Sequence, residues 1–432
     1  MEKEKIHNSF KLTKTPKQEK DSFAKVHSSF KLTKTPKEDK KKDDKIHSSF
    51  KLTKSPKHSE VEVLDLENDT ETTKTQKLKE KKQPKQKKKM SKTKKILIIV
   101  FVALFLLGSG TGLFLLYGPW SGFRNWLITT AMTTMNHQYL ATWFYSDNTI
   151  QTTLDNNKVI ESGEDTNSEL IEFVDYDNTI ITYKNKYDKE ILTKEEGNDL
   201  YKVIPISGAG LRGYLVAIYD PYKVKIGTSA YMGRSGQMLT TIASNNNAVV
   251  AMNASGFFDP EYNSNGGVPH GMVIKDGRLV SNEERLPNGG GMIGFNNDNV
   301  LVLSRMSAYQ ALASGIRDAI EFGPFLIVNG TPSFIRGNGG WGDAPRSAIG
   351  QRKDGIVLFL VMDGRDYANG ILGADMVEMT EILTNYGAYN AANLDGGTSS
   401  GLVVNGSLIN KPVNGAGQNQ TRAIPNAWIV TP

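Results

Sequence analysis

The amino-acid sequence predicts an α+β fold for residues 200–432, an antiparallel-rich mixed β-sheet with covering helices, preceded by one transmembrane helix and a disordered tail. Two observations support this prediction. Short β-type runs follow one another between Gly, Asn and Asp-Gly residues, which is typical of strands joined by tight turns. A few longer segments instead repeat their apolar residues with a helical period. About 230 residues are enough to bury one sizeable core.

The strands are predicted at 201–206, 213–219, 248–252, 271–274, 292–295, 300–303, 325–328, 355–362 and 401–404. Residues 275–278 (Lys-Asp-Gly-Arg) and 296–299 (Asn-Asn-Asp-Asn) predict tight turns between paired strands. Helices are predicted at 236–244, 307–316 and 374–386. The last of these should cover the sheet, because its apolar residues fall on one face, formed by Met376, Met379, Ile382 and Leu383.

The charge of the chain is divided between two parts of opposite sign. Residues 1–95 contain 29 Lys and 15 acidic residues, whereas residues 96–432 contain 23 basic residues, 31 acidic residues and all 41 Gly. The overall charge of +6 is therefore the sum of a +14 tail and a −8 body. A basic chain can indicate a nucleic-acid partner, but the part predicted to fold is acidic, so no nucleic acid is expected as its partner.

The two parts meet at an uncharged apolar segment, 96–117, whose 22 residues can span the ~30 Å hydrocarbon core of a bilayer. A secretory signal peptide fits less well, because the apolar run is long and 95 residues precede it. Lysines between Lys85 and Lys95 flank its start, and Arg124 stands nearly alone beyond its end. The positive-inside rule therefore predicts a single-pass plasma-membrane protein with a cytoplasmic N-terminus and an extracellular C-terminal domain.

The tail contains one motif three times, at a period of 20 residues. The copies are KIHNSFKLTKTPK at 5–17, KVHSSFKLTKTPK at 25–37 and KIHSSFKLTKSPK at 45–57. Each copy offers about three apolar side chains, too few to offset the chain entropy lost on folding, so residues 1–95 are predicted to be disordered. Two functions remain open for it, a polycation at the membrane surface and a repeated motif for a cytoplasmic partner or kinase.

Residues 118–199 are expected to form a membrane-proximal helix and a stalk before the domain at 200–432. Trp120, Phe123 and Trp126 lie at the depth expected of an interfacial aromatic belt. The rest of the segment is mostly polar and acidic, with weak periodicity.

Several common catalytic chemistries are excluded by the composition. The chain has no Cys, which rules out disulfides, thiolate catalysis and Cys-type zinc sites. Only His137 and His270 follow the tail, which argues against zinc and against a Ser-His-Asp triad. The G-x-G-x-x-G at 208–213 and the G-x-S-x-G at 397–401 are each followed by a strand pattern, so neither indicates dinucleotide binding or a nucleophile elbow. No cofactor is expected. Carboxylates could hold a divalent cation such as calcium, but no dense ligand loop supports one and no metal ligand is assigned.

The remaining candidates for a functional site are carboxylate, hydroxyl and arginine side chains next to glycine-rich turns. Two strand ends each deliver an Asp-Gly pair, and glycosyl transfer to water typically uses paired carboxylates. Three arginines could clamp a phosphate, and a Gly-Gly pair followed by hydroxyl residues is typical of an anion nest. The candidate catalytic residues are Asp395, Asp363 and Arg346. The candidate substrate-binding residues are Asn253, Gly256, Phe257, Gly323, Arg365, Gly396, Gly397, Ser399, Ser400 and Arg422.

In combination and order, these motifs resemble the phosphodiester glycosidase family over about the last half of the chain. The family's Asn-Gly-Gly-Phe-Phe stretch is present at 253–258 as Asn-Ala-Ser-Gly-Phe-Phe, so its small residues differ. Its Arg-Thr-Ala-Ile-Gly is Arg-Ser-Ala-Ile-Gly at 346–350. Its Asn-Leu-Asp-Gly-Gly-Gly-Ser lies at 393–399, with Thr398 in place of the third Gly. The Asp-Gly pair that the family has between these two motifs is Asp363-Gly364, and its arginine near the C-terminal end of the match is Arg422.

The resemblance implies hydrolysis of a sugar-1-phosphodiester at the glycosidic C–O bond, which gives a free sugar and a phosphate monoester. A phosphate monoester needs charge neutralisation more than a strong general acid, so Arg346, together with Arg365 and the nest at 396–399, is expected to hold it. Asp395 or Asp363 is expected to serve as the base for water or as the nucleophile at the anomeric carbon. Asn253 is expected to orient sugar hydroxyls.

A tethered extracellular site would meet wall or capsule glycopolymers, many of which carry sugar-phosphate links, so such a polymer is the expected substrate. The changed small residues after Asn253 and at Thr398 leave one alternative open. This alternative is a catalytically inactive protein of the same fold that binds or assembles glycopolymers. A nucleic-acid-binding function would rest on the tail alone.

Overall fold

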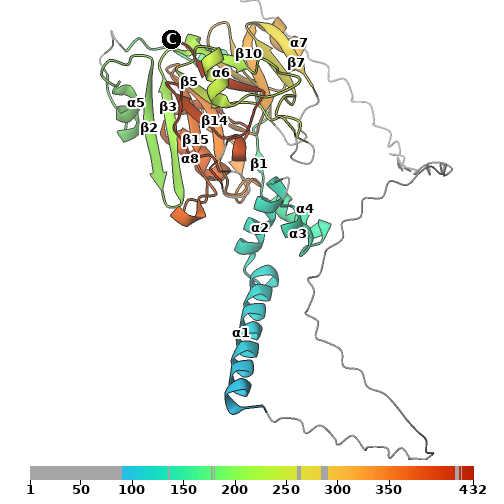
Figure 1. Cartoon of the computed structure of the whole chain (residues 1–432). Coiled ribbons are helices and arrows are strands. Elements are labelled where there is room, and N and C mark those ends of the chain that lie inside the picture. Colours follow the sequence, from blue (N-terminus) through green and yellow to red (C-terminus); the bar gives the residue numbers. More distant parts are fainter. Residues whose placement is uncertain are drawn as a thin grey trace, which may run out of the picture. The chain divides into compact units, whose positions relative to one another are not determined.

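The computed structural model describes residues 90–134, 137–176, 179, 181–259, 264–283, 290–413, 418–419 and 421–432. The predicted tail repeats lie outside these residues. The described part combines helices with antiparallel sheets, which confirms the α+β class (Figure 1).

The first element is a long apolar helix, α1 (Lys92–Tyr117). The side chain of Ser91 caps it by accepting a hydrogen bond from the Lys94 N–H. None of its residues is buried by the protein. Among the described residues it is the one helix long and apolar enough to cross a membrane, and it includes the predicted span at 96–117.

The remaining helices are α2 (Ser121–Thr133), α3 (Tyr139–Thr142), α4 (Asp147–Asn156), α5 (Lys186–Leu192), α6 (Leu239–Asn245), α7 (Ala308–Ala313) and α8 (Met376–Asn385). The last three correspond to the helices predicted for the domain. α8 begins at a capping box, in which Asp375 accepts the N–H of Glu378 and Glu378 accepts the N–H of Asp375. On the apolar face predicted for α8, Met376, Met379 and Leu383 are buried, whereas Ile382 is only partly buried.

The strands form three large sheets, and all of their pairings are antiparallel. The seven-stranded sheet has the order β12 (Thr331–Pro332), β11 (Phe325–Val328), β16 (Ala388–Asn393), β14 (Arg346–Arg352), β15 (Val357–Met362), β3 (Leu211–Ile218) and β2 (Tyr201–Gly208). One five-stranded sheet has the order β18 (Ser407–Leu408), β17 (Leu402–Val404), β5 (Val250–Asn253), β19 (Asn426–Val430) and β4 (Val224–Thr228). The other has the order β7 (Arg278–Asn282), β6 (Met272–Lys275), β10 (Ile316–Phe322), β8 (Gly291–Asn296) and β9 (Leu301–Ser304).

One apolar core joins the three sheets. Its largest fully buried side chains include Trp428 of β19, Phe295 of β8, Phe325 of β11 and Phe359 of β15. The rings of Phe295 and Trp428 meet edge to face, with centroids 5.6 Å apart. Burial of one such side chain contributes roughly 1.5–3 kcal/mol, so the sheets form a rigid frame for the loops at their ends.

The segment between α1 and the first sheet is partly built into the domain. Its strand β1 (Val159–Ile160) pairs with β13 (Phe334–Ile335). The nearly buried side chain of Glu161 accepts the N–H groups of Gly290 and Phe325 at 3.0 and 2.9 Å. Part of the segment predicted as a membrane-proximal helix and stalk therefore packs against the 200–432 domain.

Candidate active site

Three predicted residues meet at one edge of the seven-stranded sheet. Arg346 is the first residue of β14, and Asp363 and Asp395 follow the ends of β15 and β16. β14 lies between the other two strands, with Arg346 opposite Met362 and the end of β16 two residues further along. Both aspartates therefore leave the sheet near the start of β14.

Asn253, the last residue of β5, ties a second sheet to this edge. Its Nδ2 donates to the backbone oxygen of Asp395 at 2.6 Å. Its Oδ1 accepts from the Ser347 hydroxyl at 2.7 Å and from the Gly401 N–H at 3.1 Å. Asn253 is 1% exposed, and these contacts make it a positioning residue for the backbone around Asp395. Its predicted contact with sugar hydroxyls stays a prediction.

Asp395 is the partly exposed carboxylate of the site. Desolvation by the surrounding protein raises its pKa to about 6, although the Ser399 hydroxyl, Arg422, the Gly396 N–H and His270 each lower it. The Gly396 N–H donates to its Oδ1 at 2.9 Å. A carboxyl group with this pKa can gain or lose a proton near neutral pH, which suits a general acid or base.

Arg422 lies near Asp395 but is paired with another carboxylate. Its guanidinium forms an ion pair with Asp259, whose side chain is almost fully buried. It also stacks over the ring of Phe257, 4.4 Å from the ring centroid. Arg422 and Phe257 therefore form a fixed wall of the site beside Asp395.

Arg346 is buried, yet no described carboxylate lies within ion-pair distance of it. Its Nε donates to the backbone oxygen of Ala374 at 3.2 Å, and one Nη donates to those of Trp341 and Gly342. The Trp341 ring lies 5.4 Å from the guanidinium carbon. Burial and the neighbouring charge of Arg365 lower the pKa of Arg346 to about 10, so it remains a cation at neutral pH.

Arg365 is a second guanidinium without a carboxylate partner, and its side chain forms no ion pair or hydrogen bond with any described residue. A methyl group built on Gly397 would lie 3.3 Å from Nη2 of Arg365. One built on Gly396 would lie 3.4 Å from Nη1 of Arg346. The two arginines therefore converge on the Gly396-Gly397 pair. Desolvated charges are normally paired in proteins, so this pair of cations indicates an anion site.

The turn at 396–400 offers few of the free N–H groups expected of an anion nest, because among these described residues only the Thr398 N–H lacks a hydrogen bond. The N–H groups of Gly397, Ser399 and Ser400 donate to backbone oxygens at 2.8, 3.2 and 3.1 Å. Gly397 instead contributes its positive φ of 62° and the space that its missing side chain leaves for Arg365. We therefore assign the anion-binding donors to the two guanidinium groups.

Asp363 belongs to a separate buried network. Nε of Arg212 donates to its Oδ2 at 2.9 Å, and Nδ2 of Asn410 and the Lys411 N–H donate to its Oδ1 at 3.3 and 2.8 Å. Nδ2 of Asn410 also donates to the backbone oxygen of Ser400 at 3.1 Å. Asp363 is 1% exposed, so this geometry supports positioning of the 396–400 turn rather than direct contact with substrate.

The changed small residues after Asn253 fit the site without disrupting it. The backbone oxygen of Ala254 accepts the Asp395 N–H at 3.2 Å. The N–H and the hydroxyl of Ser255 are each 3.0 Å from Oδ1 of Asn426. The departure from the family motif therefore leaves Asp395 anchored to this segment.

Two further predicted glycines lie in the frame of the site. The backbone oxygen of Gly256 accepts the His270 N–H at 2.9 Å. The backbone oxygen of Gly323 accepts from Nδ2 of Asn393 at 3.0 Å, two residues before Asp395. In this structure both glycines support neighbours of Asp395 through their carbonyl groups.

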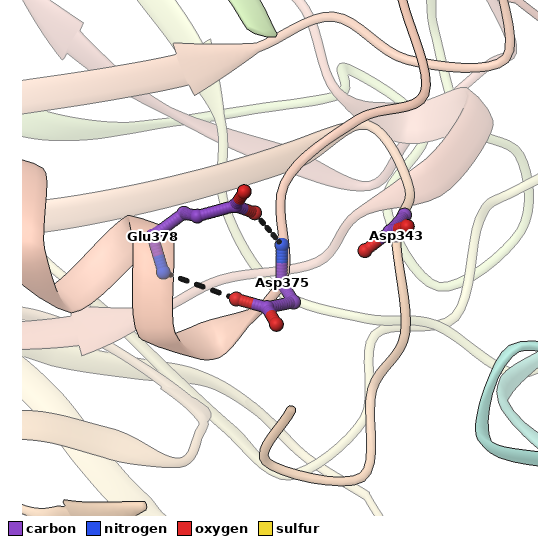
Figure 2. Close-up of side chains that lie close together, drawn as sticks. All are labelled: Asp343, Asp375 and Glu378. Atoms are coloured by element: carbon purple, nitrogen blue, oxygen red, sulfur yellow. Dashed lines mark hydrogen bonds between the residues drawn. The ribbon is translucent and has the colours of Figure 1, made fainter. Parts of the chain in front are cut away.

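One group of carboxylates with metal-ligand spacing lies nearby, formed by Asp343, Asp375 and Glu378, each with an oxygen within 4.8 Å of the others. Figure 2 shows that the capping box of α8 joins two of them. Burial raises the pKa of all three. The capping bonds account for Asp375 and Glu378, and the Trp126 indole N–H donates to Asp343, so we assign no metal to this cluster. Asp375 and Asp343 favour the charged form of Arg346 without pairing with it.

The residues that form hydrogen bonds and ion pairs with the predicted site residues were difficult to predict from the sequence. Arg212 lies in a strand, inside the G-x-G-x-x-G match at 208–213 that indicates no dinucleotide site, and Asn410 lies in a loop outside any motif. Asp259 directly follows the Phe257-Phe258 pair, which is the one hint available for the partner of Arg422. Two surface hollows, lined among others by Arg305 and by Tyr386, contain none of the predicted site residues.

Residues 246–431 match the family model described as phosphodiester glycosidase. The N-acetylglucosamine-1-phosphodiester alpha-N-acetylglucosaminidase of Mus musculus is 29% identical over 171 residues, which cover 35% of this chain and 32% of that protein. The Homo sapiens protein of the same name is 30% identical over 167 residues, which cover 34% and 32%.

A bacterial relative is similar over a longer stretch. An uncharacterized SPbeta prophage-derived protein of Bacillus subtilis (strain 168) is 32% identical over 206 residues, which cover 46% of this chain and 31% of that protein. This chain therefore spans about a third of the length of these curated relatives. Among solved structures, the zebrafish N-acetylglucosamine-1-phosphodiester alpha-N-acetylglucosaminidase catalytic domain, auto-inhibited by its pro-peptide, aligns with a TM-score of 0.45 and 21% identity. That alignment covers 55% of this chain and 86% of the zebrafish chain.

Proposed function

We propose that the chain hydrolyses the glycosidic C–O bond of a sugar-1-phosphodiester, because its residues 246–431 match the phosphodiester glycosidase family model. The observation that carries the proposal is the convergence of Arg346 and Arg365 on Gly396-Gly397, next to Asp395. A pair of desolvated cations beside a carboxyl group with a pKa of about 6 supplies both the anion clamp and the proton acceptor that this reaction needs.

The arginines act on the leaving group. When the bond from the anomeric carbon to the bridging oxygen breaks, the electron pair stays on that oxygen and the phosphate gains a negative charge. Two fixed guanidinium groups in a desolvated site stabilise this charge as it develops. The leaving oxygen already belongs to a phosphate, so no strong general acid is required.

Asp395 acts on the water. As its carboxylate takes a proton, the water oxygen bonds to the anomeric carbon and the phosphate monoester departs. Asp363 has no part in these bond changes, because Arg212, Asn410 and the Lys411 N–H already hold its oxygens. Its contribution is to fix the turn that follows Asp395.

The reaction can be tested with the full chain in detergent, an N-acetylglucosamine-1-phosphodiester and ¹⁸O-labelled water. The expected products are free sugar that carries the label and an unlabelled phosphate monoester. Label in the phosphate would mean P–O cleavage and would contradict the proposal. Absence of turnover on a range of sugar-1-phosphodiesters, with phosphate binding intact, would favour an inactive binding protein.

Arg346→Gln tests the clamp. Removing one preorganised charge donor should lower kcat/KM by about 10²–10³-fold. Arg278→Gln, which changes an exposed arginine on β7, is the matched control and should leave kcat/KM unchanged.

The setting of the reaction belongs to the same proposal. We propose that α1 anchors the chain in the plasma membrane, with the domain outside the cell and the tail in the cytoplasm. The support is an apolar helix without buried residues that follows a lysine-rich segment. A cell-surface glycopolymer with sugar-phosphate links is the substrate that this placement favours.

A further inference from the structure

We infer that helix α2 is part of the phosphate-binding site and that Trp126 is a positioning residue for Arg346. The inference rests on the proposed function, because it concerns the same arginine. α2 (Ser121–Thr133) lies far before residue 246, where the family match begins. The family domain therefore does not include it.

α2 contacts the loop that leads into β14. Nε1 of Trp126 donates to Oδ2 of Asp343 at 3.2 Å, and Nδ2 of Asn338 donates to the Thr129 hydroxyl at 2.7 Å. A third contact comes from the last residue of the helix, Thr133, whose hydroxyl lies 3.1 Å from the backbone oxygen of Trp341. Three successive turns of the helix thus touch the segment 338–343.

The same loop supplies the acceptors that hold Arg346. One Nη of Arg346 donates to the backbone oxygens of Trp341 and Gly342, and the Trp341 ring lies against the guanidinium. A methyl group built on Gly342 would lie 2.4 Å from the hydroxyl oxygen of Thr130. Helix and loop are therefore in direct contact at the residue whose carbonyl group orients Arg346. A shift of α2 would move these acceptors.

Trp126 has a second effect through Asp343, which is three residues before Arg346. Asp343 also lies beside Asp375 and Glu378, whose negative charges repel it (Figure 2). The Trp126 indole N–H donates to this carboxylate and fixes its position. Arg346 is thereby left without an ion pair to Asp343, and its charge stays available for a phosphate.

The test uses the full chain in detergent micelles, with inorganic phosphate as the probe in titration calorimetry. Trp126→Phe keeps an aromatic ring and removes the N–H. We expect the Kd for phosphate to rise about threefold to tenfold, which corresponds to one hydrogen bond. The KM for a sugar-1-phosphodiester should rise by a similar factor, with a smaller effect on kcat. Trp143→Phe, at a tryptophan that is 74% exposed, is the matched control.

A second pair of variants tests the same contact through the hydroxyl groups of α2. Thr133→Val should weaken phosphate binding, and Thr133→Ser should restore it. Thr152→Val is the control, because Thr152 is an exposed threonine on α4.

The route through Asp343 has its own test. In an Asp343→Asn background, which removes the competing charge, Trp126→Phe should lose most of its effect on phosphate affinity. Unchanged affinity in both Trp126→Phe and Thr133→Val would overturn the inference and leave α2 a mere neighbour. Tighter phosphate binding would also overturn it, because α2 would then obstruct the site. Phosphate binding without hydrolysis by the wild type would instead count against the proposed reaction alone.

Discussion

The pKa of Asp395 determines how the proposed reaction should respond to pH. Burial raises it to about 6, so the carboxylate is mostly protonated below that pH and ionised above it. As a base it must be ionised, and we expect kcat/KM to rise with pH through about 6 and then level off. A rate profile in several buffers checks this. A profile that falls through pH 6 would assign Asp395 as a general acid instead.

The same carboxyl group should destabilise the folded chain at neutral pH. Its pKa in the folded state is raised above the unfolded value of 3.8, so ionisation on the way from pH 4 to pH 6 costs free energy of folding. Asp395→Asn removes this cost and can still accept the Gly396 N–H. We expect it to abolish turnover while raising the free energy of unfolding by about 1–3 kcal/mol above pH 6.

Urea unfolding across pH checks this second prediction. The gain should be full above pH 6 and vanish below about pH 4, where both variants are neutral at this position. A gain that persists at pH 3.5 would show that ionisation of Asp395 is not its cause.

At the scale of secondary structure, local composition explains which strands could be predicted. All the strands expected for the domain are present, with shifts of a few residues at their ends, because each is a run of β-branched, aromatic or aliphatic residues. β4, β10 and β19 were not predicted as strands, although they contain typical strand residues. Two more, β16 (Ala-Tyr-Asn-Ala-Ala-Asn) and β14 (Arg-Ser-Ala-Ile-Gly-Gln-Arg), were also not predicted. Their small and polar residues have low strand propensity, and pairing with neighbours inside the sheet compensates for it.

In the candidate site, too, some residues could be predicted from local sequence and others could not. Motifs identified Arg346, Arg365 and Asp395 as candidates, because charged residues in glycine-containing motifs can be recognised from the sequence alone. The partners of these residues depend on contacts far apart in the chain, such as the 217 residues that separate Trp126 from Asp343. A spacing rule cannot find such pairs, and the role of α2 therefore depended on the structure.

The loop after β17 and β18 should stabilise the turn that follows Asp395. Asn410 is 5% exposed, donates to Asp363 and to the backbone oxygen of Ser400, and accepts the Leu402 N–H. Asn410→Asp would place two buried carboxylates against each other and remove both donors. We expect a loss of about 2–5 kcal/mol in the free energy of unfolding.

Chemical denaturation of the full chain measures this loss. Asn282→Asp, at an exposed position on β7, is the control and should change stability by less than about 0.5 kcal/mol. Wild-type stability of Asn410→Asp would remove the support for a positioning role of Asp363.

At the scale of the whole molecule, the described residues connect the candidate membrane helix to the site by a short path. The Tyr117 hydroxyl, at the end of α1, donates to the backbone oxygen of Phe144 at 2.9 Å. α2 begins at Ser121, four residues after Tyr117. α2 then contacts the loop that holds Arg346. The part of the chain outside the family domain is therefore not a passive tether in the described structure.

The proposed orientation of the chain can be tested directly, because the chain has no native Cys. A single cysteine introduced as Ser9→Cys lies in the tail, and one introduced as Asn282→Cys lies at an exposed position on β7. The 29 Lys of residues 1–95 should keep the tail on the cytoplasmic side of the membrane. A membrane-impermeant maleimide applied to intact cells should therefore label Asn282→Cys at once and Ser9→Cys only after permeabilisation. The reverse pattern would place the domain inside the cell and exclude an extracellular glycopolymer as its substrate. Labelling of neither variant before permeabilisation would show that α1 does not carry the domain across the membrane.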